Sequence, residues 1–513
     1  MSRYNQKSTS TVETVTNHQG GVAVKLDPKM ELVAILATGF DNTYYEKLSD
    51  REVRFANLIK EVASKDFEFV AKALVYARSV MGQRSVTHFG AVQLVKHLSG
   101  TQLGSRFFSK RDRKAERGGI IYRLDDILEI IACYQALNPG KPLPNSIKRG
   151  FKSALELADT YELAKYQGKG KSVSMVDVVN LVHPKPKRGM EDTFRKLMTG
   201  ELKQFDTVED KNTTAGQEVA AKVKAGTITK AQAEVELKEA KEDNYRELII
   251  SKKIGYLALL RNMRNILNNS KDVDLIEAAC GLLTNQDFIR KSLVFPHQID
   301  LALEVILDEV SSSPVRNKVI AALDKAYELS VPNMTEMGMH GRTAVVLDSS
   351  GSMTTPIVLS NKKAGSKSSI EKASLIAATF AKGLGADVFH FADLTEAIKV
   401  NHLDSINTLK NQIAGKQGAV GYGTAFDSIN RIVKGYDRVF IISDMQGRDQ
   451  VLTKFENNTH VYCVNIAGYG SSTIKPGSKV YQLFGYSSEM YELAKKVEID
   501  PKALIKAINA IVI

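Results

Sequence analysis

This 513-residue sequence has no clustered cysteines, no long apolar run and no signal-peptide core. Its three cysteines, Cys133, Cys280 and Cys463, form neither a CxxC pair nor a Cys/His cluster, which argues against a disulfide framework or structural zinc. No stretch of about 18 uncharged apolar residues occurs, and the polar N-terminus lacks an export signal. We therefore expect an intracellular, cytoplasmic protein without membrane attachment.

The composition allows two or three domains, because 513 residues exceed one ordinary core and 43% of them are apolar. The formal net charge of +12 suggests an acidic partner, but the excess is spread over both halves of the chain. Charge alone therefore suggests nucleic acid without identifying it.

The first two thirds of the chain have a helical pattern after a polar start. Residues 1–26 are rich in Ser, Thr, Asn, Gln and Gly, which predicts a flexible N-terminal arm. Residues 27–340 contain many short segments with apolar residues at three- and four-residue steps, which predicts helix pairs stacked as an α-solenoid. Within them, residues 207–247 are dominated by Ala, Lys and Glu and predict a helical insertion, with a capping box at Thr229 and Gln232.

The pattern changes at about residue 341, where strands and helices begin to alternate. Strands are predicted at 343–347, 386–391, 438–442, 460–465 and 479–484, and helices at 369–384, 424–434 and 487–510. This alternation predicts an α/β domain over 341–513 with a mainly parallel sheet. Ligand sites in such sheets lie at the carboxyl ends of the strands.

The stretch VVLDSSGSM places Asp348, Ser350 and Ser352 at the end of the first of these strands. Thr424 and Asp444 follow on later elements, and one set of carboxylate and hydroxyl oxygens suits Mg²⁺. The alternative without a metal is a polar turn that caps a helix. The ordered set of five resembles the metal-ion-dependent adhesion site of von Willebrand factor A domains. The glycines of GYG (421–423) are expected to let the backbone approach the metal.

Catalysis at this site is not expected. Metal-assisted hydrolysis needs a positioned base or an activated metal-bound water, and no His or Glu accompanies the motif at a suitable spacing. The resemblance implies instead that a partner's carboxylate fills the open metal position. We therefore predict binding rather than an enzyme.

Basic residues gather in three places before residue 200. The first place lies beside Phe107 and Phe108. The predicted RNA-binding set is Arg111, Arg113, Lys114 and Arg117; Lys148, Arg149 and Lys152; and Lys165, Lys169, Lys171, His183, Lys185, Lys187 and Arg188. Such cations neutralise phosphates, and neighbouring rings stack on unpaired bases. The alternative for each cluster is a solvated face, and for His183 a residue that closes a helix.

Three segments resemble the TROVE module: NTYYEKLSDREV (42–53), LVHPKP (181–186) and IGYLALLRNMRNI (254–266). A TROVE module followed by an A domain resembles the family of the Ro 60 kDa autoantigen and its bacterial orthologues. The resemblance implies a HEAT-like helical ring closed by a Rossmann-like A domain. It also implies Y RNA bound on the outer surface and single-stranded ends of misfolded RNA in the central hole. His183 occupies the position of the family's RNA-contacting His, with Lys165, Lys169 and Lys171 in its basic neighbourhood.

Together with the basic clusters, the resemblance implies a monomeric RNA-binding ring protein for noncoding RNA quality control that recruits a 3′ exoribonuclease. Two alternatives remain: a metal-dependent adhesion module with a helical scaffold, and a Mg²⁺-dependent nuclease.

Overall fold

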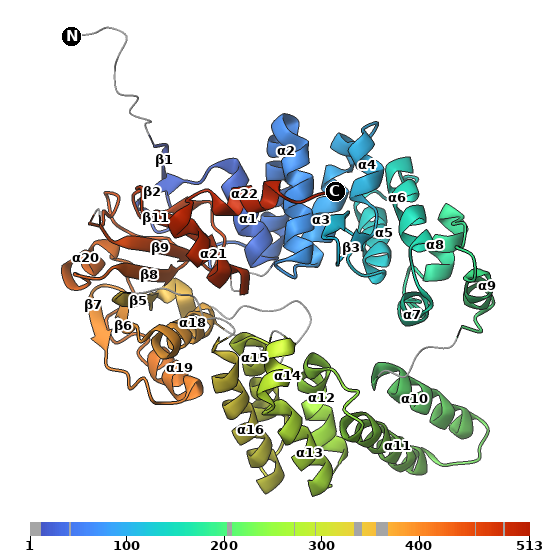
Figure 1. Cartoon of the computed structure of the whole chain (residues 1–513). Coiled ribbons are helices and arrows are strands. Elements are labelled where there is room, and N and C mark those ends of the chain that lie inside the picture. Colours follow the sequence, from blue (N-terminus) through green and yellow to red (C-terminus); the bar gives the residue numbers. More distant parts are fainter. Residues whose placement is uncertain are drawn as a thin grey trace.

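The computed structural model describes residues 12–40, 43–202, 208–270, 272–292, 294–332, 341–354, 368–456, 458–485 and 488–513. A long row of helices leaves an α/β part, curves away and returns to it (Figure 1). The helices of the row are α1 (Pro28–Thr38), α2 (Leu48–Ser79), α3 (Ser85–Leu98), α4 (Gln102–Phe107), α5 (Asp125–Leu137), α6 (Asn145–Glu156), α7 (Thr160–Lys165), α8 (Met175–Val182), α9 (Glu191–Thr199), α10 (Val208–Lys224), α11 (Lys230–Ile250), α12 (Tyr256–Asn269), α13 (Val273–Leu283), α14 (Gln286–Lys291), α15 (Pro296–Glu309) and α16 (Pro314–Ser330).

Local sequence signals explain most of these helices. Buried apolar side chains recur along one face of α5, which ends at Leu137 and is followed by Asn138 and Pro139. The segments 51–64 and 67–80, which the helical period predicts as separate helices, form the single helix α2, which is kinked at Asp66 (φ −155°, ψ 73°). The Asp66 carboxylate accepts the Phe69 N–H at 3.0 Å and so starts the second half of α2 as a capping residue does. None of the described helices has the length and apolarity that a membrane crossing needs.

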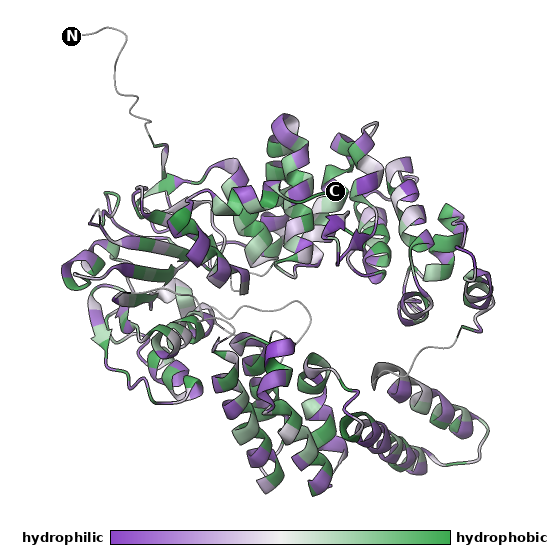
Figure 2. Ribbon diagram, viewed as in Figure 1, coloured by the Kyte–Doolittle hydropathy of each residue, from purple (hydrophilic) through white to green (hydrophobic). Residues whose placement is uncertain are grey.

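Helices α10 and α11 form an antiparallel hairpin that is largely hydrophilic along α11 (Figure 2). The predicted capping box at Thr229 and Gln232 is present at the start of α11. Ion pairs from Lys222 to Glu236 and from Lys211 to Glu247 join the two helices. This hairpin occupies the segment where an insertion was predicted.

The N-terminal segment differs from the flexible arm that its composition suggested. Strands β1 (Thr14–Thr16) and β2 (Val22–Lys25) pair with each other, and β2 pairs with β10 (Ser471–Ser472). The prediction is therefore wrong for these residues, because their polar side chains do not prevent backbone pairing with a strand about 450 residues later. Residues 1–11 lie outside the described part of the chain.

A six-stranded sheet forms the centre of the α/β part, in the order β11-β9-β8-β5-β6-β7. Its strands are β5 (Thr343–Asp348), β6 (Asp387–Phe391), β7 (Thr395–Ile398), β8 (Arg438–Ser443), β9 (His460–Asn465) and β11 (Val480–Phe484). All pairs are parallel except β6 with β7. The five predicted strands are confirmed, and the half-exposed β7 was missed.

The helices of the α/β part match the prediction only in part. Helix α18 (Ser369–Leu384) agrees with it, whereas α19 (Ile406–Ala414) was missed. The segment 424–434 holds only the short turns η2 (Phe426–Ser428) and α20 (Ile429–Ile432). The expected C-terminal helix divides into α21 (Ser488–Ile499) and α22 (Ala503–Asn509), on either side of Pro501.

Both faces of the sheet are buried. Val345 and Leu347 of β5 face the core that continues into the helical row, and the alternate residues Ala344 and Val346 face a second, smaller core. Continuous apolar strands are therefore expected here.

The helical row contacts the α/β part at both of its ends. Helix α1 packs on β11 and α2 on α22, while α15 and α16 pack on α18 and α19 (Figure 1). At the second contact the Lys410 ammonium lies 2.6 Å from the Asp300 carboxylate, and both side chains are buried. Because burial of ions is costly, a close pair at this junction fixes how the two parts meet.

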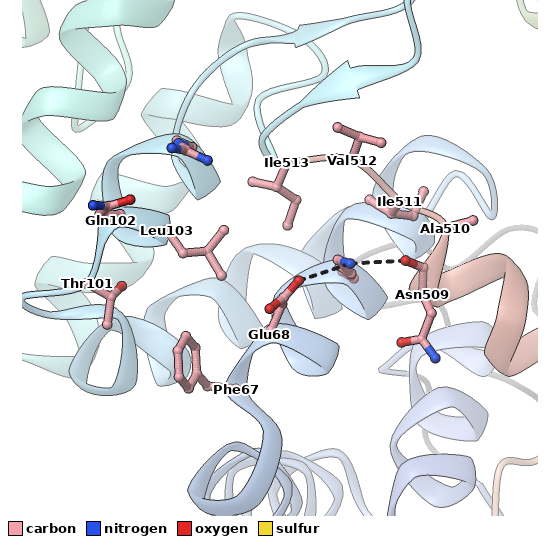
Figure 3. Close-up of a pocket in the computed structure, with 12 residues that line it drawn as sticks. Phe67, Glu68, Thr101, Gln102, Leu103, Asn509, Ala510, Ile511, Val512 and Ile513 are labelled. Carbon is pink, nitrogen blue, oxygen red and sulfur yellow. Dashed lines mark hydrogen bonds and ion pairs between the residues drawn. The ribbon is translucent and has the colours of Figure 1, made fainter.

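The C-terminal segment crosses the surface of α2 and α4. Lys72 binds the Asn509 carbonyl and the Glu68 carboxylate, each at 3.0 Å (Figure 3). A cavity of about 480 Å³ lies between this segment and the helices, lined among others by Phe67, Leu103 and Ile513.

Candidate metal centre and nucleic-acid interface

The five predicted metal ligands come from loops at the carboxyl edge of the sheet. Asp348 ends β5 and Asp444 follows β8, and because β5 and β8 are adjacent and parallel, the two carboxylates meet. Ser350 and Ser352 lie in the turn after β5 that leads into η1 (Gly351–Thr354). Thr424 lies in a loop that is held against this turn, because the Gly351 N–H donates to the Tyr422 carbonyl of the loop at 3.0 Å. The structure therefore brings these segments together at one edge.

Hydrogen bonds hold the two carboxylates and the serines in a single network. The Ser350 N–H donates to Asp348 Oδ1 at 2.9 Å, and the Ser350 and Ser352 hydroxyls lie 3.2 Å apart. Ser443 donates its hydroxyl to Asp348 Oδ2. Ser352 lies near the Asp444 carboxylate, which accepts the Gln446 N–H at 3.0 Å. Ser443 was not predicted, although its place directly before Asp444 is the signal that identifies it.

The electrostatics of this edge favour a bound cation. Burial raises the pKa of Asp348 to about 6, and burial together with the nearby Asp348 charge raises the pKa of Asp444 to about 7. The five ligand residues are 0 to 4% exposed. A divalent cation would offset the cost of keeping both carboxylates ionised here.

One buried atom tests whether these residues fit a metal. The Thr424 hydroxyl oxygen is buried and has no hydrogen-bond partner among the described residues. Such a group costs free energy unless something binds it, and a hard cation accepts a hydroxyl oxygen as ligand. No group of three or more His, Cys, Asp or Glu suited to a metal occurs in the described ranges. The candidate therefore rests on two carboxylates and three hydroxyls, which fit Mg²⁺.

The glycines of the 421–423 loop serve a neighbour that sequence reasoning missed. A Cβ on Gly421 would lie 1.9 Å from an Asp393 carboxylate oxygen, and Gly421 has φ +90°. Asp393 accepts the N–H groups of Tyr422 and Gly423 and lies 2.5 Å from the Arg448 guanidinium. These bonds hold the pKa of Asp393 below its usual range. The glycines thus let the backbone approach Asp393, and the expectation that they also approach a metal stays a prediction.

The first basic cluster divides into buried and exposed residues. Phe107 and Phe108 are fully buried, so their rings pack in the core instead of stacking on bases. Arg111 is 7% exposed and donates to the Gly118 carbonyl at 3.0 Å and the Glu116 carbonyl at 2.8 Å. Its role here is to hold the hairpin of β3 (Arg111–Asp112) and β4 (Arg117–Gly118). Exposed cations on the hairpin are Arg113, Lys114 and Arg117.

The second and third clusters lie on neighbouring elements. Helix α6 carries the exposed Arg149 and the half-buried Lys148 and Lys152, and it packs against α8. The Lys185 N–H donates to Glu156, the last residue of α6, at 2.9 Å. The exposed cations of the third cluster are Lys165, Lys169, Lys171, Lys185, Lys187 and Arg188.

His183 closes a helix, as one interpretation of the sequence suggested, whereas its predicted contact with RNA stays a prediction. It ends α8 in the left-handed conformation (φ 45°, ψ 65°), with its N–H bonded to the Val179 carbonyl. Its side chain is exposed. A non-glycine residue in this conformation costs free energy, and such residues gather at functional sites.

Four aromatic and basic side chains beside these clusters were missed. Arg113 lies over the Tyr122 ring at 4.3 Å, and Arg123 lies over the Tyr166 ring at 5.1 Å. Lys165 lies 5.3 Å from the centre of the Tyr161 ring and 5.8 Å from that of Tyr166. The signal in the sequence was YELAKYQ (161–167), which alternates tyrosine with a basic residue.

A buried aspartate positions this strip of cations and rings. Asp126, at the start of α5, is fully buried and accepts the N–H groups of Tyr122 at 3.0 Å and Arg123 at 2.9 Å. Arg78 and His88 bind the same carboxylate. These donors hold the pKa of Asp126 well below its usual range despite burial.

Comparison with known proteins supports the fold at the level of structure alone. No protein-family model matches this sequence, and no curated protein matches it. Among solved structures, the Ro protein (RSR) of Deinococcus radiodurans is similar over 92% of this chain and 100% of its own, with a TM-score of 0.59 and 16% sequence identity. The fold is therefore that of a Ro protein, and the resemblance to the Ro family is confirmed for the fold.

Proposed function

We propose that this chain is an RNA-binding protein of the Ro type. Its helical part (27–340) is a HEAT-like ring, and residues 341–513 are a von Willebrand A domain that closes it. Residues 1–26 precede this ring, and 207–247 are an insertion in it. One observation carries the proposal: the exposed cations Arg113 and Lys165 and the half-buried Arg123 lie over the rings of Tyr122 and Tyr166, in a chain with the fold of a Ro protein.

This surface suits unpaired RNA because lysines and arginines neutralise phosphates while tyrosine rings stack on exposed bases. Recognition by stacking and charge selects strand state and shape more than sequence. The ligands are small structured RNAs of the Y RNA type on the outer basic surface. Single-stranded ends of misfolded RNAs bind in the centre of the ring. The role is noncoding RNA quality control by a cytoplasmic monomer that passes RNA to a 3′ exoribonuclease.

A gel-shift comparison tests strand selectivity. A structured RNA with a single-stranded 3′ tail is expected to bind more tightly than the same RNA with a blunt duplex end. Replacement of Tyr166 by leucine should weaken the binding of tailed RNA by about 1–3 kcal/mol and leave the binding of blunt RNA unchanged. Equal affinity of the wild type for both RNAs would contradict the proposal.

The salt dependence of binding tests the basic clusters. Removing two phosphate contacts with Lys165→Ala and Lys169→Ala should reduce the slope of log K against log salt by about 1.4 to 1.8. The matched control is Lys224→Ala with Lys230→Ala, two exposed lysines of the α10–α11 hairpin. If the control lowers the slope as much, binding is general attraction to a basic protein. His183→Ala, tested in the same way, examines the left-handed residue after α8.

The A domain would hold Mg²⁺ with Asp348, Ser350, Ser352, Thr424 and Asp444, and the cation would supply positive charge to a carboxylate ligand. Among the described residues near this edge we identify no general base, so we propose binding and not catalysis. Tailed RNA incubated with the protein and Mg²⁺ should remain intact. RNA cleavage that Asp444→Ala abolishes would establish a nuclease instead.

A second candidate function is capture of a protein partner through its carboxylate. The unpartnered Thr424 hydroxyl and the oxygen-only ligand set favour it. In that case Asp348→Ala abolishes capture of a defined carboxylate-bearing partner, while Lys165→Ala, Lys169→Ala and His183→Ala leave it unchanged. The two functions can coexist, since they use different halves of the chain.

A further inference from the structure

The turn of the N-terminal hairpin lies against the loop that follows Asp444. Asn17 donates its side-chain amide to the Gly447 carbonyl at 2.6 Å, and the Val22 N–H donates to the Asp449 carbonyl at 2.8 Å. A Cβ on Gly21 would lie 2.2 Å from the Gly447 carbonyl oxygen, so the approach admits no side chain. The hairpin is thus seated on the edge of the sheet that carries the metal ligands.

Two further contacts run from this turn toward the ligands themselves. The His18 N–H donates to the Gln446 side-chain oxygen at 3.1 Å, and the Gln446 N–H donates to Asp444 Oδ1 at 3.0 Å. Gln19 donates its side-chain amide to the Tyr45 hydroxyl. A chain of hydrogen bonds therefore leads from the hairpin to Asp444.

Tyr45 completes this arrangement from the loop before α2. Its hydroxyl lies in the neighbourhood of Ser352 and of the Asp444 carboxylate. The ring stacks on His18, with centroids 5.0 Å apart and planes 6° from parallel. The Tyr45 N–H donates to the Tyr469 hydroxyl at 3.1 Å. The side chain is thereby fixed on three sides, with its polar atom at a candidate ligand.

A site that awaits an external carboxylate should expose its ligands. Here each of the five is nearly or fully buried, although ligands of such sheets enter at this edge. The hydroxyl of Tyr45 stands beside Ser352, where an incoming group would have to compete with it. The chain's own residues therefore take part in covering the site.

We propose that Tyr45, held by Gln19 and His18, closes the metal site from within the chain. The cation then acts as a clasp between the N-terminal hairpin and the sheet. An external carboxylate reaches it only after the Tyr45 loop and the hairpin move. This inference rests on the Mg²⁺ site proposed above and adds the internal group that guards it.

Linkage makes the clasp measurable in two ways. If Mg²⁺ binding stabilises the closed hairpin, Mg²⁺ lowers the rate of hydrogen exchange in residues 14–25. Deleting the Tyr45 hydroxyl must then weaken Mg²⁺ binding to the extent that it reduces this protection. Coupling of about 5-fold or more is the usual range for linked sites.

The experiment measures hydrogen exchange and Mg²⁺ affinity on the full chain, with Mg²⁺ or with EDTA. Tyr45→Phe keeps the ring and removes the hydroxyl. Tyr44→Phe is the matched control, because Tyr44 is the neighbouring residue and is 56% exposed. We expect Mg²⁺ to protect residues 14–25 in the wild type and in Tyr44→Phe. In Tyr45→Phe we expect that protection to fall about 5-fold or more, and added acetate to raise Mg²⁺ affinity.

The outcomes separate the clasp from the metal site. Mg²⁺ binding that Asp348→Asn abolishes, with unchanged exchange in the hairpin or with Tyr45→Phe equal to the wild type, refutes the clasp and leaves the metal site standing. No Mg²⁺ binding sensitive to Asp348→Asn refutes the metal site and the clasp with it.

Discussion

Replacing Lys410 by methionine is expected to open the contact between the helical row and the α/β part. Lys410 is 8% exposed, and its ammonium lies 2.6 Å from the carboxylate of Asp300, which is 0% exposed. Glu304 and Asp324 add negative charge around the same ammonium. Methionine preserves the length of the side chain but removes the ammonium that lies 2.6 Å from the buried Asp300 carboxylate. Removing one partner of a buried pair costs about 3–5 kcal/mol.

That cost corresponds to a factor of about 10² to 4 × 10³ in the equilibrium between closed and open junctions. Hydrogen exchange should accelerate in α15, α16 and α19, and the melting temperature should fall. The control is Lys416→Met, an exposed lysine just after α19. The double variant Lys410→Met with Asp300→Asn should recover part of the lost stability, because it also removes the negative charge of Asp300. Equal effects of Lys410→Met and Lys416→Met, or no recovery in the double variant, would refute this reasoning.

Three further predictions concern pH, metal and core. Burial raises the pKa of Glu304 to about 7, above its unfolded value, so its contribution to stability is full at low pH and is lost as pH rises through about 7. Glu304→Gln should therefore reduce the change of melting temperature with pH between about pH 5 and 8. Parallel plots of melting temperature against pH for the wild type and the variant would count against this. Thr424→Val should change stability little in EDTA, because the buried hydroxyl has no partner among the described residues, and should reduce the stabilisation by Mg²⁺; an equal Mg²⁺-induced shift in both proteins excludes Thr424 as a ligand. Phe107→Ala should cost about 3–5 kcal/mol of stability through core packing, and selective loss of RNA binding at unchanged stability would contradict that assignment.

The sequence was most informative where the physics is local. Apolar runs identified five strands of the main sheet, and the adjacency of parallel strands then brings the ends of β5 and β8 together. The motif that begins at Asp348 needed no more than this to be placed beside Asp444. Many helices of the row were likewise predicted from their period, whereas α19 was missed and the kink at Asp66 depends on a single carboxylate that caps the next turn.

The features that escaped prediction depend on contacts between distant parts of the chain. Thr14–Thr16 looks like a polar arm until its neighbour β2 pairs with β10. Phe107 beside a run of cations looks like a stacking platform, and only the fold shows that it faces the core. Arg111 belongs to the same run, yet backbone carbonyls occupy its guanidinium. Tyr45 lies in a segment that resembled a family signature, and nothing local links it to Ser352.

The burial of α1 has a consequence for how the protein is made. Every residue from Leu32 to Ala37 is buried, and part of that cover is β11 (Val480–Phe484). Arg51, also buried, donates to the Ala467 carbonyl, 416 residues further along the chain. At about 5–20 residues per second, a ribosome needs roughly 20–80 s to produce those partners. During that interval the nascent chain carries an apolar helix that α2 covers but β11 does not yet cover, so we expect slower elongation to prolong the exposure of α1.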